Sequence, residues 1–422
     1  MTQAESTVAL TQPSPEVVAN IAAFAKEGVD LGRGRFDAQS QPFWQGLLDL
    51  GTELWLDTGD IEGAEANWAS EFSALTTNNT LLNNEIQKGI YDELINKSAG
   101  VLEGVDPEVM VVEIAFILNA HHGLRLAQRF GGKVSVELHT HLSHDIENTL
   151  AYARRYYEIC PEHFIVKIPM TAAGLVATRT LRQEGIPINF TLGFSGRHNY
   201  VAAGFANPSF VNVFLGRLNA YFVDNNLGDG KFVGERATLA SQRFIKELTG
   251  NLPEPTRQIA ASMRGASQVA DLAGLDVYTM PLGVASGALA ELDGSFSSQL
   301  DVVHEVSLND SVDPARVRME NLWDANEADR KFVESINANV PTTGAELVDR
   351  AHDCGAGDLF PRLSDEDVDH IANDGKIPNH ERWADRVQSG ELAIDTLLQL
   401  AGLASFTKDQ KALDDRIRGI VF

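Results

Sequence analysis

The sequence predicts an α/β fold: a closed (β/α)8 TIM barrel with N-terminal helices, an inserted segment and C-terminal helices. Two observations predict the barrel. Short apolar runs alternate with amphipathic stretches, which is the pattern of a parallel sheet covered by helices. The alternation repeats eight times within residues 51–300, close to the size of about 250 residues that is usual for such barrels.

Each predicted strand is a short run of mainly apolar residues. The runs are Leu54–Asp57, Ala74–Asn78, Val134–Leu138, Phe164–Pro169, Ile188–Phe194, Phe210–Gly216, Arg257–Ser262 and Val277–Pro281. Amphipathic helices are predicted between them at Asp145–Glu158, Ala172–Glu184, Gly234–Leu248 and Arg264–Ala273. An open doubly wound sheet is the alternative, but it usually carries a Gly-rich turn after the first strand. Here that turn reads Asp57-Thr58-Gly59-Asp60.

Three segments flank the barrel. Residues 1–50 are predicted to form a tail, residues 1–13, followed by helices. Ser14 caps the first of these helices, and Pro15 occupies its first position. Residues 301–380 are rich in Asp and Asn and interrupt the strand–helix rhythm, which predicts an acidic insertion with short helices, one of them starting at Ser364. Residues 381–422 are expected to pack on the barrel as two helices, 381–401 and 407–418.

Composition excludes several function classes. The chain has 34 Lys and Arg against 59 Asp and Glu, a net charge of −25, so it would repel nucleic acids and anionic membranes. We find no signal peptide and no window of about 18 apolar residues; Val109–Ala120 is expected to be a short buried helix. Two cysteines cannot form a disulfide framework or a four-cysteine zinc site. We therefore expect a cytoplasmic enzyme or binding protein.

Nearly every predicted strand ends in a polar residue, and the C-terminal ends of barrel strands form active sites. These residues are Asp57, Asn78, Glu137, Lys167, Asn189 with Thr191, Asn212 with Arg217, and Ser262 with Arg264.

Lys167 is the sharpest signal, because it lies in the apolar strand Phe164–Pro169. Burial lowers the pKa of a lysine, and a neutral amine is a nucleophile toward carbonyl groups. A lysine at a strand end that points to solvent or pairs with an acid is the alternative.

Asp57 and Glu137 could divide general acid and base work, or Asp57 could instead cap the next helix.

Arginines follow the late strands, where barrel loops often hold phosphate. Arg217 and Arg264 as a pair indicate an anionic substrate, because arginine binds phosphate bidentately. Arg197, in the loop after the fifth strand, is a possible third cation.

A rival hypothesis comes from His139 and His141 after the third strand. A His-x-His pair at a strand end occurs in metal-dependent barrel hydrolases. Such enzymes place the pair on the first strand, however, and His163 and His198 are poorly placed to complete a site. We expect no metal and no cofactor.

The strand ends together resemble the transaldolase family of class I, Schiff-base-forming aldolases. The segments that carry the resemblance are Asp57–Asp60, Thr76–Asn78, Val136-Glu137, Phe164–Gly174, Glu184–Ser195, Phe214–Arg217 and Ala261–Arg264. The C-terminal segment from Gly402 through Phe406 to Ile417 resembles the family's last helix. The resemblance covers roughly residues 51–300 and 381–422.

The resemblance implies a role for each residue. Lys167 would form the Schiff base with a ketose, Asp57 would take the C4 hydroxyl proton, and Glu137 would shuttle protons through a water held by Thr191. Asn78 and Asn189 would hold the hydroxyls of a dihydroxyacetone unit. Arg217, Arg264 and Ser262 would bind the phosphate of phosphorylated ketose and aldose substrates. The residue Phe214 resembles the one that the family's transferases carry at that position, whereas fructose-6-phosphate aldolases usually carry Tyr there. Asn212, a further substrate-binding candidate, stands where the family usually has Ser.

Other departures from the family are Asn79, His139, the loop Ser195–His198 and the 301–380 insertion. The expected activity is a transaldolase of the pentose phosphate pathway, with a possible homo-oligomeric state. A fructose-6-phosphate aldolase-like enzyme, a sulfosugar transaldolase and a non-catalytic sugar-phosphate binder are the alternatives.

Overall fold

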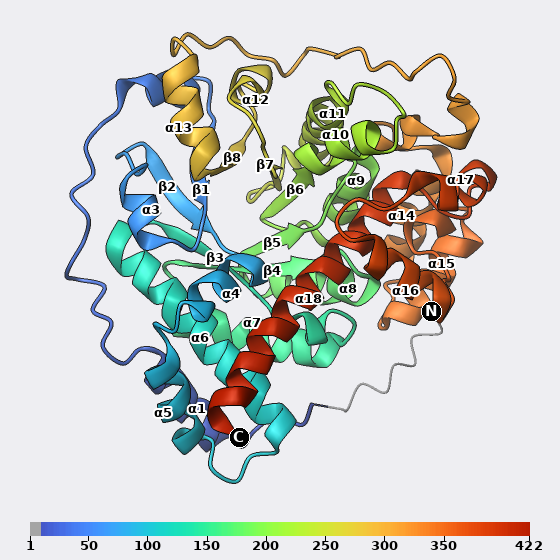
Figure 1. The fold of residues 1–422 in the computed structure, drawn as a ribbon. Helices are drawn as coiled ribbons and strands as arrows, with labels where there is room; N and C mark the ends of the chain where they lie inside the picture. Colours follow the sequence, from blue (N-terminus) through green and yellow to red (C-terminus); the bar gives the residue numbers. More distant parts are fainter. Residues whose placement is uncertain (1–9) are drawn as a thin grey trace.

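The computed structural model describes residues 10–422 and shows a closed barrel of eight parallel strands, in the order β1 to β8 (Figure 1). The strands are β1 Glu53–Asp57, β2 Phe72–Thr76, β3 Lys133–Glu137, β4 Phe164–Pro169, β5 Ile188–Thr191, β6 Phe210–Phe214, β7 Arg257–Ala261 and β8 Val277–Pro281. The predicted (β/α)8 class is confirmed. Each predicted strand is present, with ends that differ by a few residues.

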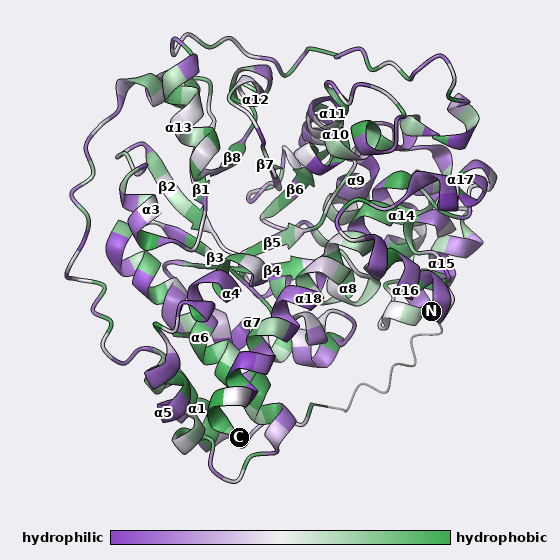
Figure 2. Cartoon of the chain, in the orientation of Figure 1, coloured by the Kyte–Doolittle hydropathy of each residue, from purple (hydrophilic) through white to green (hydrophobic). Residues whose placement is uncertain are grey.

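The strands are apolar because they are covered on both faces. Every residue of β4, β5 and β6 is buried, since one face of each strand lines the barrel interior and the other contacts helices. Figure 2 shows the same division: the strands are mainly hydrophobic, and the hydrophilic colours gather on the surrounding helices.

Helices surround the barrel. In chain order they are α1 Pro15–Ala25, α2 Gln45–Leu48, α3 Ile61–Glu65, α4 Asn79–Gln87, α5 Asp92–Val101, α6 Pro107–Phe130, α7 Ile146–Ile159, α8 Ala172–Gln183, α9 Gly196–Ala206, α10 Leu215–Asp224, α11 Val233–Thr249, α12 Ser267–Asp271 and α13 Leu282–Glu291. After the barrel come α14 Glu327–Ala338, α15 Gly344–Asp353, α16 Asp365–Asp374, α17 His380–Ser389 and α18 Ile394–Val421. The tail predicted for residues 1–13 lies mostly outside the described residues.

The apolar segment predicted as a short buried helix is longer than expected. Asp106 caps α6 by accepting from the backbone N–H groups of Glu108 and Val109, and the helix continues for 24 residues to Phe130. Within residues 10–422 it is the one helix long and apolar enough to cross a membrane, but 89% of its most apolar window is buried inside the protein. Burial as a core helix accounts for this apolar character.

The segment after the barrel crosses to the opposite side of the molecule. From α13 the chain runs as an extended connection along one edge of the barrel, and the helices α14–α16 then gather beside α8 and α9 (Figure 1). There α14 packs against α9, and α15 against α8. The predicted helix start at Ser364 is confirmed. Ser364 caps α16 in a reciprocal capping box with Asp367.

Two C-terminal helices are present as predicted, but their predicted bounds, 381–401 and 407–418, are wrong. The structure has α17 and then α18, a single helix of 28 residues that crosses the barrel region (Figure 1). Gly402, which falls between the two predicted helices, lies inside α18 for a packing reason. A Cβ atom there would lie 2.9 Å from Cδ2 of Leu192 and 3.1 Å from Nη1 of Arg217. Glycine therefore allows α18 to approach the strand ends closely.

Candidate active site

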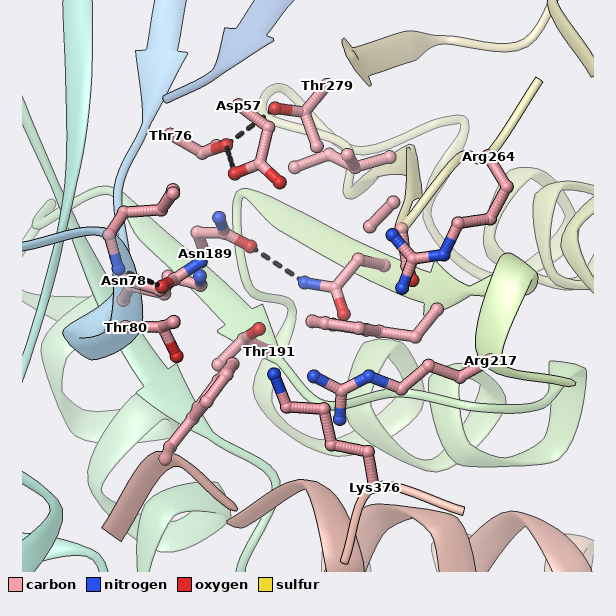
Figure 3. Close-up of a pocket in the computed structure, with 18 residues that line it drawn as sticks. Asp57, Thr76, Asn78, Thr80, Asn189, Thr191, Arg217, Arg264, Thr279 and Lys376 are labelled. Atoms are coloured by element: carbon pink, nitrogen blue, oxygen red, sulfur yellow. Dashed lines mark hydrogen bonds between the residues drawn. The ribbon is translucent and has the colours of Figure 1, made fainter. Parts of the chain in front are cut away.

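A cavity of about 210 Å³ opens at the C-terminal ends of the strands (Figure 3). Ten of the eleven predicted site residues line it: Asp57, Asn78, Lys167, Asn189, Thr191, Asn212, Phe214, Arg217, Ser262 and Arg264. The eleventh, Glu137, is buried next to Lys167. Residues spread over more than two hundred positions of sequence thus meet at one end of the barrel.

Strand register places Lys167 beside two other polar residues. Glu137 of β3 and Asn189 of β5 are its register partners on either side. The Nζ atom of Lys167 lies 3.4 Å from Oε2 of Glu137, and the two side chains are only 5% and 3% exposed. Nζ also donates to the carbonyl oxygen of Thr77 at 3.1 Å.

Burial raises the pKa of Glu137, and the neighbouring Lys167 opposes that rise. A carboxyl group with a raised pKa beside an amine can exchange a proton with it during a reaction. This pairing with an acid was the structural alternative for Lys167. Lys167 nevertheless lines the cavity, with Glu137 buried behind it.

Asp57 ends β1 and is also buried. Its Oδ1 accepts from Oγ1 of Thr76 at 2.8 Å, and that hydroxyl contacts Oγ1 of Thr279 at 2.6 Å (Figure 3). Burial raises the pKa of Asp57, and Lys167 is the strongest opposing influence. The helix that follows, α3, is preceded by Asp60, which makes no capping bond with its side chain. Asp57 therefore does not cap it.

A row of amides lies across the floor of the cavity. The Nδ2 group of Asn189 donates to Oγ of Ser135 at 3.1 Å. Nδ2 of Asn212 donates to Oδ1 of Asn189 at 3.1 Å (Figure 3). The backbone N–H of Gly193 donates to Oδ1 of Asn212 at 3.3 Å. Asn212 therefore fixes the orientation of Asn189 and joins it to the loop after β5.

Two further polar residues have unused hydrogen-bonding capacity. Asn78 caps α4, with its Oδ1 accepting from the N–H of Leu81 at 2.8 Å, which leaves the amide nitrogen for the cavity. The hydroxyl of Thr191 is fully buried and has no hydrogen-bond partner. A buried polar group without a partner is costly, so this hydroxyl is well suited to hold a water or a substrate atom.

Arg217 is the most unusual residue of the site. It lies in the first turn of α10, is 6% exposed, and its Nε and Nη1 atoms are buried without hydrogen-bond partners. Its guanidinium group lies 5.2 Å from the ring centroid of Phe214 and 5.7 Å from that of Phe406. Burial, together with the nearby charge of Arg264, lowers the pKa of Arg217 to about 10.

Ser262 and Arg264 complete this wall of the cavity. Ser262 has a left-handed backbone, with φ of 61°, and its buried Oγ has no hydrogen-bond partner. A serine in this conformation is uncommon and concentrates at functional sites. Arg264 is exposed at the cavity edge. Donors without acceptors thus converge where an anion would satisfy them.

The possible role of Arg197 as a third anion-binding cation is wrong. Its side chain is completely buried away from the cavity and donates to Asp395 and Asp358, with Asp329 at 3.7 Å. Acidic partners offset the cost of burying the Arg197 charge, and these three carboxylates come from segments far along the chain.

The part of the chain that the structure describes offers no ligand set for the metal hypothesis. Within residues 10–422, no three His, Cys, Asp or Glu side chains are grouped as metal ligands would be. His139 contacts Asp414 of α18 through Nε2 at 3.2 Å, and its Nδ1 accepts from the N–H of His141 at 3.1 Å. His139 therefore attaches the loop after β3 to the C-terminal helix.

Several lining residues were not singled out from the sequence. They are Thr80, Leu81, Ile259, Ala261, Thr279, Lys376 and Phe406. Phe406 was noted only as part of the last helix, although its ring contacts both Lys167 and Arg217. Nothing in the sequence pattern pointed to Lys376, which belongs to the segment predicted as an acidic insertion.

Comparison with known proteins agrees with this geometry. The profile of the family described as Transaldolase/Fructose-6-phosphate aldolase matches residues 54–339. A transaldolase of Nostoc sp. is 27% identical over 305 residues, which cover 68% of this chain and 88% of that protein. Transaldolases of Trichormus variabilis and Methylococcus capsulatus are each 28% identical and cover 61% and 60% of this chain, and 80% of each relative. The chain therefore belongs to the transaldolase/fructose-6-phosphate aldolase family and is an enzyme, a transferase as these relatives are.

Proposed function

We propose that this enzyme is a transaldolase that moves a dihydroxyacetone unit from sedoheptulose 7-phosphate to glyceraldehyde 3-phosphate, or from fructose 6-phosphate to erythrose 4-phosphate. The reaction belongs to the pentose phosphate pathway. The observation that carries the proposal is a buried amine, Lys167, 3.4 Å from the Glu137 carboxylate, in a cavity whose other wall bears partnerless arginine donors.

The amine of Lys167 attacks the C2 carbonyl carbon of the ketose, and the carbinolamine then loses water to give a Schiff base. Glu137 delivers the proton that departs with the hydroxyl group, through a water held by the Thr191 hydroxyl. Its raised pKa suits this task, because a protonated carboxyl group can act as an acid near neutral pH.

Asp57 then takes the proton from the C4 hydroxyl group as the C3–C4 bond breaks. The aldose leaves, and the electron pair of the broken bond is held in the enamine on Lys167. Asp57 is suited to this role because burial raises its pKa. Addition of the acceptor aldehyde reverses these steps, and water hydrolyses the new Schiff base. Asn78 and Asn189 hold the hydroxyl groups of the three-carbon unit.

The phosphate binds at the opposite wall, on Arg217, Arg264 and the Ser262 hydroxyl. An arginine fork matches phosphate geometry, and the partnerless Nε and Nη1 atoms of Arg217 are ready to donate.

Asn212, which stands where the family usually has Ser, motivates a second candidate function. It is an aldolase that releases free dihydroxyacetone, or a transaldolase for another anionic sugar such as a sulfosugar.

Reduction with borohydride in the presence of fructose 6-phosphate, followed by peptide mass mapping, tests the mechanism. The expected result is a single reduced adduct on Lys167 and none in Lys167→Met, which should fold normally but lose turnover. Substantial turnover by Lys167→Met would remove the Schiff base from the mechanism. Product analysis with and without acceptor aldehyde separates a transferase from an aldolase.

A further inference from the structure

Lys376 is the one residue of the cavity that comes from the segment predicted as an acidic insertion. Its side chain extends into the pocket beside the guanidinium group of Arg217 and toward Thr191 (Figure 3). It lies in the short connection between α16 and α17, far in sequence from every strand end.

The connection that carries Lys376 is fixed at both ends. Gly375 ends α16 with φ of 79°, a backbone conformation that favours glycine. Just before it, Asp374 accepts from Arg382 at 2.6 Å and from the N–H of Asn379 at 3.1 Å.

The same connection is bound to the helix that carries Arg217. At the C-terminal end of α10, Nδ2 of Asn225 donates to the carbonyl of Pro378 at 3.1 Å, and its Oδ1 accepts from the N–H of His380 at 2.8 Å. The hydroxyl of Tyr221 contacts Nδ1 of His380 at 2.8 Å. Since α10 begins with the turn that holds Arg217, one helix positions both cations.

The three cations around this wall lack acidic partners. Among the described residues, no carboxylate lies within ion-pair distance of Arg217, Arg264 or Lys376. The chain carries a net charge of −25, so acids are abundant elsewhere. Positive charges that line one cavity without a carboxylate in direct contact repel one another, and a bound anion would relieve that repulsion.

Resting on the proposed function, we infer that Lys376 is a specificity-determining residue that binds the phosphate group of the sugar substrate together with Arg217 and Arg264. Its ammonium group supplies a mobile point charge at the exposed side of the phosphate, whereas the buried Arg217 supplies a fixed fork. The segment after the barrel thereby contributes directly to substrate selection.

Lys376→Met tests the inference, because it removes the charge and keeps most of the side-chain length. Lys331→Met is the matched control: Lys331 is also an exposed lysine, on α14 of the same segment, and does not line the cavity. Binding of inorganic phosphate is measured by calorimetry. We expect Lys376→Met to bind phosphate about 5- to 20-fold more weakly than the wild type, Lys331→Met to match the wild type, and Lys376→Arg to recover most of the affinity.

The second readout is the ratio of kcat/KM for glyceraldehyde 3-phosphate over glyceraldehyde, which should fall by a similar factor only in Lys376→Met. Wild-type phosphate affinity in Lys376→Met, or a borohydride adduct on Lys376 itself, would overturn the inference. If the wild type forms no Schiff base, the proposed function fails, and phosphate binding still decides the role of Lys376.

Discussion

Replacement of Arg217 by methionine should make the protein more stable and less active at once. Arg217 is held in an apolar setting between Phe214 and Phe406 with two donor atoms unpaired. Its pKa falls to about 10 because of burial. Each pKa unit corresponds to about 1.4 kcal/mol, so the buried charge costs the folded state roughly 3 kcal/mol.

Arg217→Met removes that cost and keeps an unbranched apolar stem. Unfolding entropy is about 2.1 cal/mol/K per residue, and the chain has 422 residues. A gain of roughly 3 kcal/mol therefore corresponds to a rise in Tm of about 3 °C. Phosphate should raise the Tm of the wild type, because it binds the folded state, and should have much less effect on the variant.

Differential scanning calorimetry with and without phosphate measures both effects. Arg264→Met is the matched control, since Arg264 is an exposed arginine of the same wall. It should leave the Tm without phosphate within about 1 °C, since surface substitutions are nearly neutral. A lower Tm for Arg217→Met in the absence of phosphate would show that the guanidinium group holds the fold together, and would refute its assignment as a charge kept for an anion.

Three other predictions concern the catalytic acids, the C-terminal helix and the buried acid cluster. Asp57→Asn should still allow borohydride trapping but slow C–C cleavage about 10²- to 10⁴-fold, whereas Glu137→Gln should slow trapping itself; equal trapping rates would contradict this division. Phe406→Leu should lower kcat/KM about 3- to 30-fold in steady-state assays, because the ring contacts both Lys167 and Arg217; an unchanged value would mean that these contacts are incidental. Burial raises the pKa of Asp329 to about 6, so its ionisation destabilises the fold as pH rises from about 4 through 6. Asp329→Asn should therefore be more stable than the wild type by roughly 2–3 kcal/mol in urea unfolding at pH 7.5 and equal to it near pH 4; a pH-independent difference would contradict this reasoning.

The barrel and most of the candidate site could be predicted because both depend on local pattern. Apolar runs such as Phe164–Pro169 mark strands, and a barrel brings every strand end to one face. Lys167 and Asp57 were therefore found from their position alone. Lys376 could not be found in this way, because the turn that carries it is attached to α10 by contacts between residues about 150 positions apart.

Arg197 shows the opposite error. A loop arginine next to a strand end can point into the cavity or away from it, and the local sequence does not determine which direction its side chain takes. The direction is decided by Asp358 and Asp395, 161 and 198 residues further along. The break predicted between residues 401 and 407 is wrong for a related reason: the close packing of Gly402 against Leu192 and Arg217 depends on the fold and not on local pattern.

The buried cluster around Arg197 also bears on how the protein matures during synthesis. Its carboxylates lie on α14, in the turn near Asp358 and on α18, and α18 and the turn before α17 supply Phe406 and Lys376 to the cavity. A ribosome releases these segments only after the whole barrel has emerged. Contacts of such long sequence separation form late, so a nascent barrel has an arginine without its counterions and an unfinished pocket. The enzyme should consequently gain activity only when α18 has left the ribosome.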